Sequence, residues 1–188
     1  DVRDYTFDAL YDRLGYVTQK AVLFSGTVQD NIFFGQSEAA DTDETLQQAL
    51  QLSQAAEFVD RYPEKAAHPI AQLGRNVSGG QKQRLSIARA LARRPEILIF
   101  DDSFSALDYK TDATLREGLA KQLPGTTKII VAQRISTIRH ADQILVLDRG
   151  EIAGLGTHDA LMASCPVYRE IAMSQLSEEE LKKGGASK

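Results

Sequence analysis

The most constraining feature of the sequence is a short apolar strand that ends in two carboxylates directly after a long amphipathic helix. The run ILIFDD at 97–102 has four apolar residues followed by Asp101 and Asp102, as expected of a strand buried on both faces in a parallel sheet. The helix before it spans 78–94 and stops at Pro95. Alternation of helices with buried strands is typical of α/β domains. The sequence therefore predicts an α/β fold with a parallel core sheet.

Apolar periodicity predicts the other elements of this fold. Further strands are expected at 14–18, 128–132 and 143–147, and Asp148-Arg149-Gly150 is expected to turn the last of them into a hairpin with EIAGLG. Helical segments are expected at 27–34, 43–61 and 108–122, and from about Val167 onward, with a capping box at Ser177 and Glu180. Residues 63–76 contain two prolines and a glycine and are expected to form a loop.

Composition narrows the class of partner. The chain has 22 basic and 26 acidic residues and a net charge of −4, which gives no electrostatic reason to expect nucleic acid or an anionic membrane surface. A single cysteine, Cys165, excludes an internal disulfide and favours a reducing compartment. No apolar run approaches the roughly 20 residues of a membrane-spanning helix. The sequence therefore predicts a soluble, intracellular chain that does not bind nucleic acid.

Asp101 and Asp102 are candidate ligands of a metal ion. A strand of a parallel sheet presents the residues at its carboxyl end to the crevice where ligands bind. Two adjacent carboxylates there could hold Mg²⁺ and position a water molecule. The alternative is a pair of solvated loop acids, and the six residues of ILIFDD alone leave both interpretations open.

A second candidate site opens the helix at 78–94, with the sequence Ser78-Gly79-Gly80-Gln81. Two glycines let the backbone approach a ligand closely, and the free N–H groups of a first helical turn attract an anion such as phosphate. The alternative is a plain serine N-cap followed by flexible glycines.

The order and spacing of these features resemble the ATP-binding cassette (ABC) domain of exporters. The stretch NVSGGQKQRLSIARALARRPEILIFDDSFSALD is similar to the family's signature, Walker B strand and D-loop in one continuous run. YVTQ, which ends in Gln19, resembles the Q-loop, and VLFSGTVQDNI resembles the exporter segment that follows it. VAQRISTIRHADQILVLDRGEIAGLGTHDAL resembles the switch region and the C-terminal part. The resemblance covers nearly all residues from 14 to 162.

The resemblance implies a nucleotide sandwiched between two cassettes arranged head to tail, with ATP and Mg²⁺ as ligands. It implies that Asp101 holds Mg²⁺ through water, that Gln19 reaches the metal or the attacking water, and that Asp108 carries communication across the dimer. Ser78, Gly79 and Gly80, with Gln81 in the same motif, would bind the γ-phosphate of the nucleotide held by the partner. The further implied partner is the transmembrane domain of an exporter, which places the cassette at the cytoplasmic side of the cell membrane.

Two positions depart from the family pattern. Asp102 stands where the family has a catalytic glutamate, and Gln133 stands where it has the switch histidine. Asp102 reaches about 1 Å less than a glutamate, and a misplacement of about 1 Å can cost roughly 10²-fold in rate. Gln133 cannot take up a proton. The intact signature would serve the partner's site, so the sequence predicts one half of a heterodimeric exporter with a degenerate site of its own. In the loop before the signature, Gln72 replaces the family's acid.

No G-x-x-x-x-G-K-[ST] motif occurs among the 188 residues. We therefore expect a cassette whose first strands and phosphate-binding helix lie before Asp1. Within it we expect a partial nucleotide-binding domain over 1–175, with a helical subdomain at about 30–92, a core at about 14–29 and 93–165, and a charged tail at 176–188.

One other interpretation remains open at this point, and a further one is disfavoured. The chain could be a remnant without a phosphate-binding loop that acts only as a binding or structural module. An ABC ATPase of the DNA-repair or chromosome type is disfavoured, because the sequence contains no long coiled-coil insertion.

Overall fold

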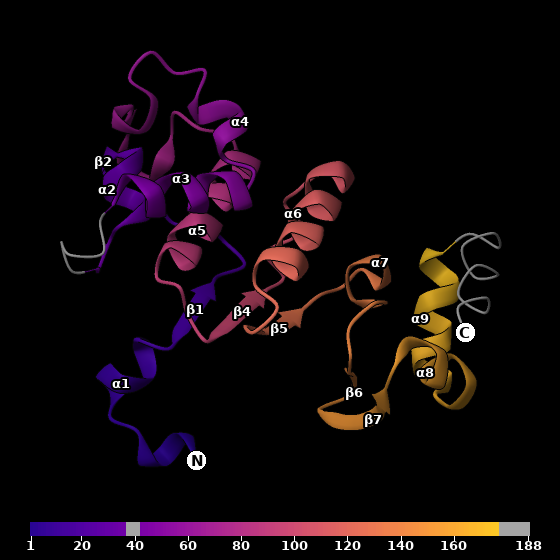
Figure 1. Ribbon diagram of the computed structural model, residues 1–188. Coiled ribbons are helices and arrows are strands. Elements are labelled where there is room, and N and C mark those ends of the chain that lie inside the picture. Colours follow the sequence, from indigo (N-terminus) through magenta and orange to yellow (C-terminus); the bar gives the residue numbers. More distant parts are fainter. Residues whose placement is uncertain (37–41, 177–188) are drawn as a thin grey trace. The chain divides into compact units, whose positions relative to one another are not determined.

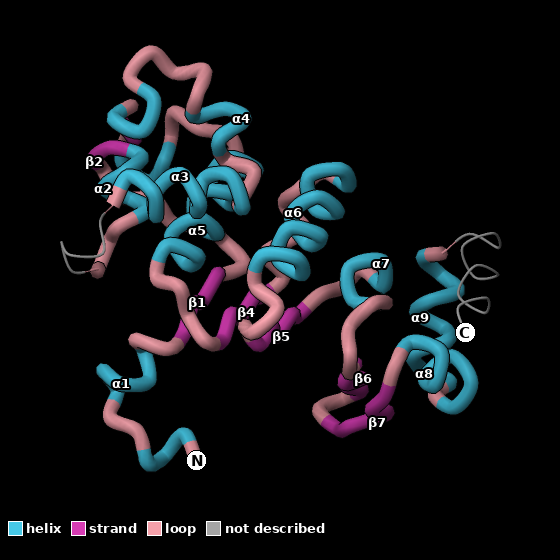
Figure 2. Tube along the Cα trace, in the orientation of Figure 1, coloured by secondary structure: helices cyan, strands magenta, loops and turns pink. Residues whose placement is uncertain are grey.

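The computed structural model describes residues 1–36 and 42–176. The chain divides into two compact units, Asp1–Val131 and Ala132–Lys188, and each is described by itself. Figures 1 and 2 show the order of the helices and strands along the chain. The capping box expected at Ser177 and Glu180 lies outside the described residues. The expected subdivision into a helical subdomain, a core and a tail stays a prediction.

The first unit is built on the predicted parallel sheet. The strands β1 (Leu14–Val17), β4 (Ile97–Asp101) and β5 (Thr127–Val131) pair in the order β1-β4-β5, with both pairs parallel. This confirms the three strands expected in this region and the α/β class.

Burial of the sheet differs from the expectation that its strands are buried on both faces. Leu98 and Phe100 of β4 are fully buried, whereas Tyr16, Ile129 and Val131 on the opposite face are each about half exposed. The core cluster explains this asymmetry, because it combines β4 with apolar residues of the two long helices α5 (Gly79–Ala92) and α6 (Tyr109–Gln122). These helices cover one face of the sheet within the described residues.

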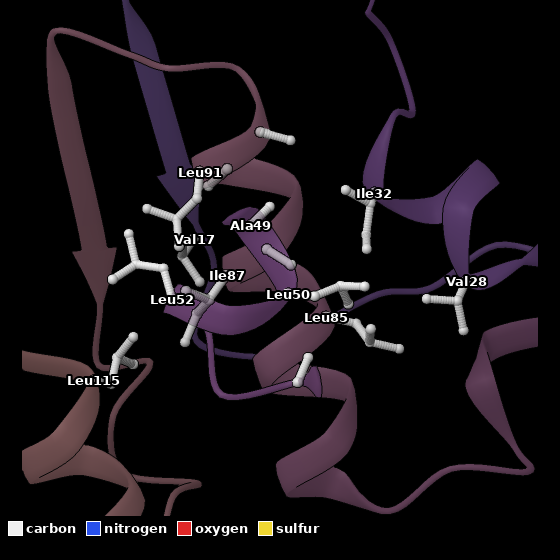
Figure 3. Packing of buried hydrophobic residues seen from close by; sticks show 14 of the residues in the cluster. Val17, Val28, Ile32, Ala49, Leu50, Leu52, Leu85, Ile87, Leu91 and Leu115 are labelled. Atoms are coloured by element: carbon white, nitrogen blue, oxygen red, sulfur yellow. The ribbon is translucent and has the colours of Figure 1, made fainter. Parts of the chain in front are cut away.

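The helical part of this unit packs on α5. It contains α2 (Val28–Ile32), α3 (Asp43–Leu52) and α4 (Ala56–Val59). Figure 3 shows buried side chains of β1, α3 and α5 gathered in one cluster, among them Val17, Leu50 and Ile87. Near the N-terminus, η1 (Val2–Asp4) and α1 (Phe7–Tyr11) precede the first strand.

The prediction of a single helix at 43–61 is wrong, because the chain forms two helices with a break between them. Gln54 has a φ of 61°, a left-handed conformation that cannot continue a right-handed helix. The backbone N–H of Ala55 donates to the carbonyl of Leu50 at 2.8 Å, which closes the first helix before the second begins. The apolar pattern of the segment is helical on both sides of this residue, so periodicity alone does not reveal the break.

The loop expected at 63–76 is more ordered than predicted. It contains η3 (Lys65–Ala67), β3 (Pro69–Ile70) and η4 (Gln72–Gly74), and β3 pairs antiparallel with β2 (Gly26–Thr27). Asn76 fixes the end of this segment, since its Nδ2 donates to the carbonyl of Pro69 at 2.8 Å. The short ladder holds residues 63–76 beside the start of α2.

The second unit is a hairpin packed against helices. It contains α7 (Ile135–Ile138), β6 (Ile144–Asp148), β7 (Glu151–Gly156), α8 (His158–Ser164) and α9 (Pro166–Gln175). The antiparallel pairing of β6 with β7 confirms the predicted hairpin. Positive φ angles at Arg149 and Gly150 form its tight turn. Leu145 and Leu147 are exposed, so β6 is buried on one face only, contrary to the expectation of a fully buried strand.

A search of the described residues for a helix that is both long and apolar enough to cross a membrane finds none.

Candidate functional site

Asp101 is the last residue of β4 and is held by a phenol from the neighbouring strand. The Oη of Tyr16 donates to Oδ2 of Asp101 at 2.9 Å. This hydrogen bond raises the pKa of the Tyr16 phenol above its ordinary value, with smaller contributions from burial and from the charge of Asp101. The phenol therefore stays protonated and remains a donor to the carboxylate. Asp101 is not a freely solvated loop acid.

Asp102 lies just after β4 in a left-handed turn, with a φ of 44°. Its backbone N–H donates to the carbonyl of Val131 at 2.9 Å, and its side chain accepts from Nε2 of Gln19 at 3.1 Å. The residue is only 9 % exposed. The alternative interpretation of solvated loop acids is therefore wrong for this residue as well. The carboxyl ends of β1 and β4 bring Gln19, Asp101 and Asp102 together.

Side chains of α5 form hydrogen bonds with the segment that contains Gln19. Nε2 of Gln83 donates to the carbonyl of Thr18 at 3.1 Å, and Nη1 of Arg89 donates to the carbonyl of Val22 at 3.0 Å. Both donors lie on α5, so the segment on either side of Gln19 is fastened to this helix.

The expected second site lies at the start of α5, where Ser78 is the N-cap. Its Oγ accepts from the backbone N–H of Gln81 at 3.2 Å, and Oε1 of Gln81 accepts from the N–H of Ser78 at 2.8 Å. This reciprocal capping box explains why the helix begins here. The serine N-cap that was the alternative interpretation is therefore present.

The glycines of this helix start are not required by the packing of the chain itself. A Cβ added to Gly79 would meet no atom within 4 Å, and one added to Gly80 would meet the carbonyl of Ala106 at 3.5 Å, an ordinary contact. Open space beside Gly79 leaves room for a ligand to approach the backbone N–H groups.

Asp108 caps the N-terminus of α6. Its Oδ1 accepts from the backbone N–H groups of Lys110 and Thr111 at 3.1 and 3.0 Å, and its Oδ2 accepts from the Thr111 hydroxyl at 2.7 Å. The hydrogen bond from the Thr111 backbone, followed by that from its side chain, lowers the pKa of the Asp108 carboxyl. This aspartate therefore stays ionised at the start of the helix.

Gln133 lies in the second unit, at the start of the segment that leads into α7. Its main-chain carbonyl accepts from Nε2 of Gln175 at 2.8 Å. Oε1 of Gln175 accepts in turn from the N–H of Ile135 at 2.9 Å. Gln175 therefore fixes the backbone on which Gln133 stands. Gln133 and Asp102 belong to different units.

Three residues that contact this region were missed by sequence reasoning. They are Tyr16, Gln83 and Arg89. Tyr16 shares the face of the sheet on which Asp101 stands, since it pairs with Ile99, two residues before Asp101 on the alternating strand. Gln83 is only 2 % exposed, and a buried polar side chain usually has a hydrogen-bond partner, but its burial is visible only in the structure. Nothing in the sequence distinguishes Arg89 from the other basic residues of the helix.

A magnesium ion fits the donor set at the end of β4. Mg²⁺ is commonly bound by one or two carboxylates together with substrate phosphates and water, and Asp101 and Asp102 each supply one carboxylate at this end of the strand. Among residues 1–36 and 42–176 there is no group of three or more His, Cys, Asp or Glu side chains that could hold a metal by themselves. A metal here would thus share its coordination with another ligand.

Paired carboxylates at the edge of a parallel sheet, together with a glycine-rich helix start, are typical of α/β domains that bind nucleotides. Comparison with known proteins gives the family. The family model described as ABC transporter matches residues 1–105, more than half of the chain. The chain belongs to the ABC transporter family, and the cassette fold expected from the sequence motifs is confirmed.

Individual relatives agree with this assignment. The chain is 46 % identical over 176 residues to an uncharacterized ABC transporter ATP-binding protein of Mycobacterium tuberculosis. The aligned region covers 93 % of this chain and 30 % of that protein. It is 40 % identical over 182 residues to Multidrug resistance protein 1 of Entamoeba histolytica, covering 96 % of this chain and 14 % of the relative. The chain thus spans less than a third of the length of either relative.

A solved structure leads to the same fold. The structure of a bacterial Atm1-family ABC exporter with ATP bound superposes with a TM-score of 0.86 at 36 % sequence identity, covering 92 % of this chain and 30 % of that one. The resemblance to exporter cassettes noted in the sequence is confirmed. ATP-binding domains of this family bind ATP, generally with Mg²⁺.

Proposed function

We propose that this chain is part of the ATP-binding cassette of an exporter and that its site at the end of β4 hydrolyses ATP poorly. The observation that carries the proposal is the group of Gln19, Asp101 and Asp102 at one edge of the sheet. This group lies on the same unit as a helix that begins with the signature sequence. Similarity to the bacterial Atm1-family exporter, whose structure has ATP bound, supports the exporter assignment.

ATP would be shared between this cassette and a second one arranged head to tail. Asp101 would hold Mg²⁺ through water, and Gln19 would reach the metal or the attacking water. The metal would neutralise phosphate charge and polarise the transferred group. Ser78, Gly79, Gly80 and Gln81 would contact the γ-phosphate of the nucleotide held by the partner, and the open space at Gly79 supports such an approach. Asp108 would carry communication across the dimer.

The low hydrolytic activity follows from Asp102 and Gln133. The Asp102 carboxylate is shorter than that of a glutamate, and one of its oxygens accepts from the Gln19 amide. It is therefore poorly placed to take a proton from a water molecule. Gln133 can donate a hydrogen bond to a phosphate but cannot carry a positive charge or a proton. Two such departures from the family pattern favour a partner of different sequence that supplies the efficient site.

The partners of the cassette follow from the same assignment. A second, different cassette would complete each nucleotide site, and a transmembrane domain of the exporter would hold the pair at the cytoplasmic side of the membrane. Gln72 stands where exporter cassettes have an acid in the loop before the signature, so contact of this loop with the membrane domain would lack that charge.

The test introduces the family's glutamate and histidine at positions 102 and 133 of the complete two-cassette transporter. Asp102→Glu combined with Gln133→His should raise steady-state ATP turnover, because the longer carboxylate and the imidazole supply the missing base and proton carrier. A control substitution, Asp60→Glu, lengthens an exposed carboxylate on the same unit and should leave turnover unchanged. Equal turnover in the restored variant and the parent would refute the degenerate site.

A further inference from the structure

The segment that carries Gln19 is fastened to α5 by two side chains that the proposed function does not use. Gln83 is 2 % exposed, and its Nε2 donates to the carbonyl of Thr18, the residue directly before Gln19. Arg89 lies six residues further along the helix and donates from Nη1 to the carbonyl of Val22. The two contacts lie on either side of Gln19, so they restrict the path of the chain through this residue.

Arg89 has further contacts that hold the same segment. Its Nε donates to the carbonyl of Asn31 at 2.7 Å, and its Nη2 donates to Oδ1 of that residue at 3.0 Å. Oδ1 of Asn31 also accepts from the backbone N–H of Phe24 at 2.8 Å. Arg89 and Asn31 together therefore fix residues 22–24 against α2.

Two aromatic rings complete the surroundings of Arg89. The guanidinium lies 5.3 Å from the ring centroid of Phe24 and 5.7 Å from that of Phe34, and the two rings stack at 4.2 Å. Burial lowers the pKa of Arg89 from its ordinary value, but an arginine remains charged at neutral pH. The guanidinium donates from Nε, Nη1 and Nη2 to three oxygens and lies against two rings, and a lysine does not offer this planar fork of donors.

The helix that supplies these two side chains is the one that begins at Ser78 and Gly79. A helix is a rigid element, so a displacement at its N-terminus also moves its later turns. Gln83 and Arg89 pass such a movement to residues 18–22, and Gln19 in turn contacts Asp102. The contacts thus form a continuous connection from the helix start to the carboxylate at the end of β4.

We propose that Gln83 and Arg89 are positioning residues that link the signature of this chain to its own Gln19 and Asp102. The proposal rests on the proposed function, because only then do the two ends of the connection belong to two different nucleotide sites. Nucleotide bound at the partner's site, through the signature, then alters the position of Gln19 in this chain's site. The coupling is reciprocal, since linkage between two binding sites acts equally in both directions.

A double-mutant cycle in the complete transporter tests the connection. Arg89→Met removes the donors but keeps an unbranched apolar side chain, and Gln83→Leu removes a single hydrogen bond at nearly constant volume. Each should raise the Kd for ATP at this chain's own site by about two- to thirty-fold when Gln19 is present. In the Gln19→Ala background neither substitution should raise this Kd further, because the residue through which it acts is gone.

Arg84→Met is the matched control. Arg84 lies on the same helix, donates to the carbonyl of Gln54 at 3.0 Å and stacks over the ring of Phe58 at 4.9 Å, but it does not hold residues 18–24. Any loss caused by Arg84→Met should be the same with and without Gln19. Equal factors for Arg89→Met in both backgrounds would show a role in stability alone and would overturn the proposal.

Amide hydrogen exchange separates this outcome from a failure of the proposed function. Arg89→Met and Gln83→Leu should raise exchange at residues 18–24, whereas Arg84→Met should not. Unchanged exchange there would overturn the connection by itself. A transporter that neither binds nor hydrolyses ATP, but shows the expected change in exchange, would refute the proposed function and leave the connection supported.

Discussion

Asp102 is held after β4 by hydrogen bonds to residues that are distant in the sequence. Its type and its place after a buried strand are visible in the sequence, and they predict a carboxylate at the edge of the sheet. Its left-handed φ of 44° and its hydrogen bond from Gln19 are not visible, because they depend on where Val131 and the Gln19 segment come to lie. Tyr16 and Arg89 were missed for the same reason, since their partners are far away in the chain.

The neighbouring Ser103 gives a prediction at the same scale. Its side chain is fully buried, and its Oγ has no hydrogen-bond partner among the residues that the structure describes. A buried hydroxyl without a partner loses its hydration on folding and gains nothing in return. Ser103→Ala should therefore raise the free energy of unfolding of the first unit by about 1 kcal/mol in urea denaturation.

Ser53→Ala is the control for this measurement. Ser53 is equally buried, but its Oγ donates to the carbonyl of Leu50 at 3.2 Å and accepts from the N–H of Ala55 at 3.3 Å. Its removal should lower the free energy of unfolding. If both substitutions lower it equally, the account of Ser103 is wrong.

At the scale of helices and strands, the sequence predicts most of the elements and misses local breaks and short ladders. The strands of the sheet, the helices α5 and α6 and the hairpin of the second unit are confirmed. The break at Gln54 and the ladder of β2 with β3 were not predicted, because each depends on a few backbone hydrogen bonds rather than on a repeating apolar pattern. The expectation that the strands are buried on both faces was wrong. A short apolar run is compatible with one covered face or with two, so it does not show how many faces are covered.

The contact between α8 and α9 leads to a prediction about pH. Nδ1 of His158 lies 2.8 Å from Oη of Tyr168 inside the core of the second unit. Burial, and to a smaller extent the charge of Arg139, lowers the pKa of His158 below its ordinary value of 6.5. Burial also raises the pKa of Tyr168, so the phenol stays protonated and can donate to the neutral imidazole.

Protonation of His158 should lower the stability of the second unit. Below pH 6.5 the unfolded chain binds a proton at this histidine before the folded chain does, so protonation favours unfolding. The stability of the second unit should fall as the pH drops from 6.5 toward the lower pKa of the folded state. Urea midpoints measured between pH 7.5 and pH 5 should show this decline, and His158→Gln should flatten it. His68→Gln, in the first unit, should leave it in place; a decline that persists in His158→Gln would contradict the assignment.

On the scale of the whole chain, the proposed nucleotide site needs a phosphate-binding loop that these residues do not contain. The 188 residues contain no G-x-x-x-x-G-K-[ST] motif, and such a loop supplies the backbone N–H groups and the lysine that hold the β- and γ-phosphates. The isolated 188-residue chain should therefore show no rise in Tm when millimolar ATP and Mg²⁺ are added. A ligand that binds the folded state raises its stability in proportion to RT ln(1 + [L]/Kd), so a concentration-dependent rise would contradict the prediction. Mg²⁺ alone is the control.

The space beside Gly79 has a consequence for the evolution of such chains. No atom of the described chain fills the place of a Cβ there, and glycine loses more conformational freedom on folding than any residue with a side chain. In a mutant library, selection for expression alone should accept or even favour larger residues at this position. Selection for growth that depends on transport should return glycine. A difference between the two selected populations would separate what the fold requires at the start of α5 from what its ligand requires.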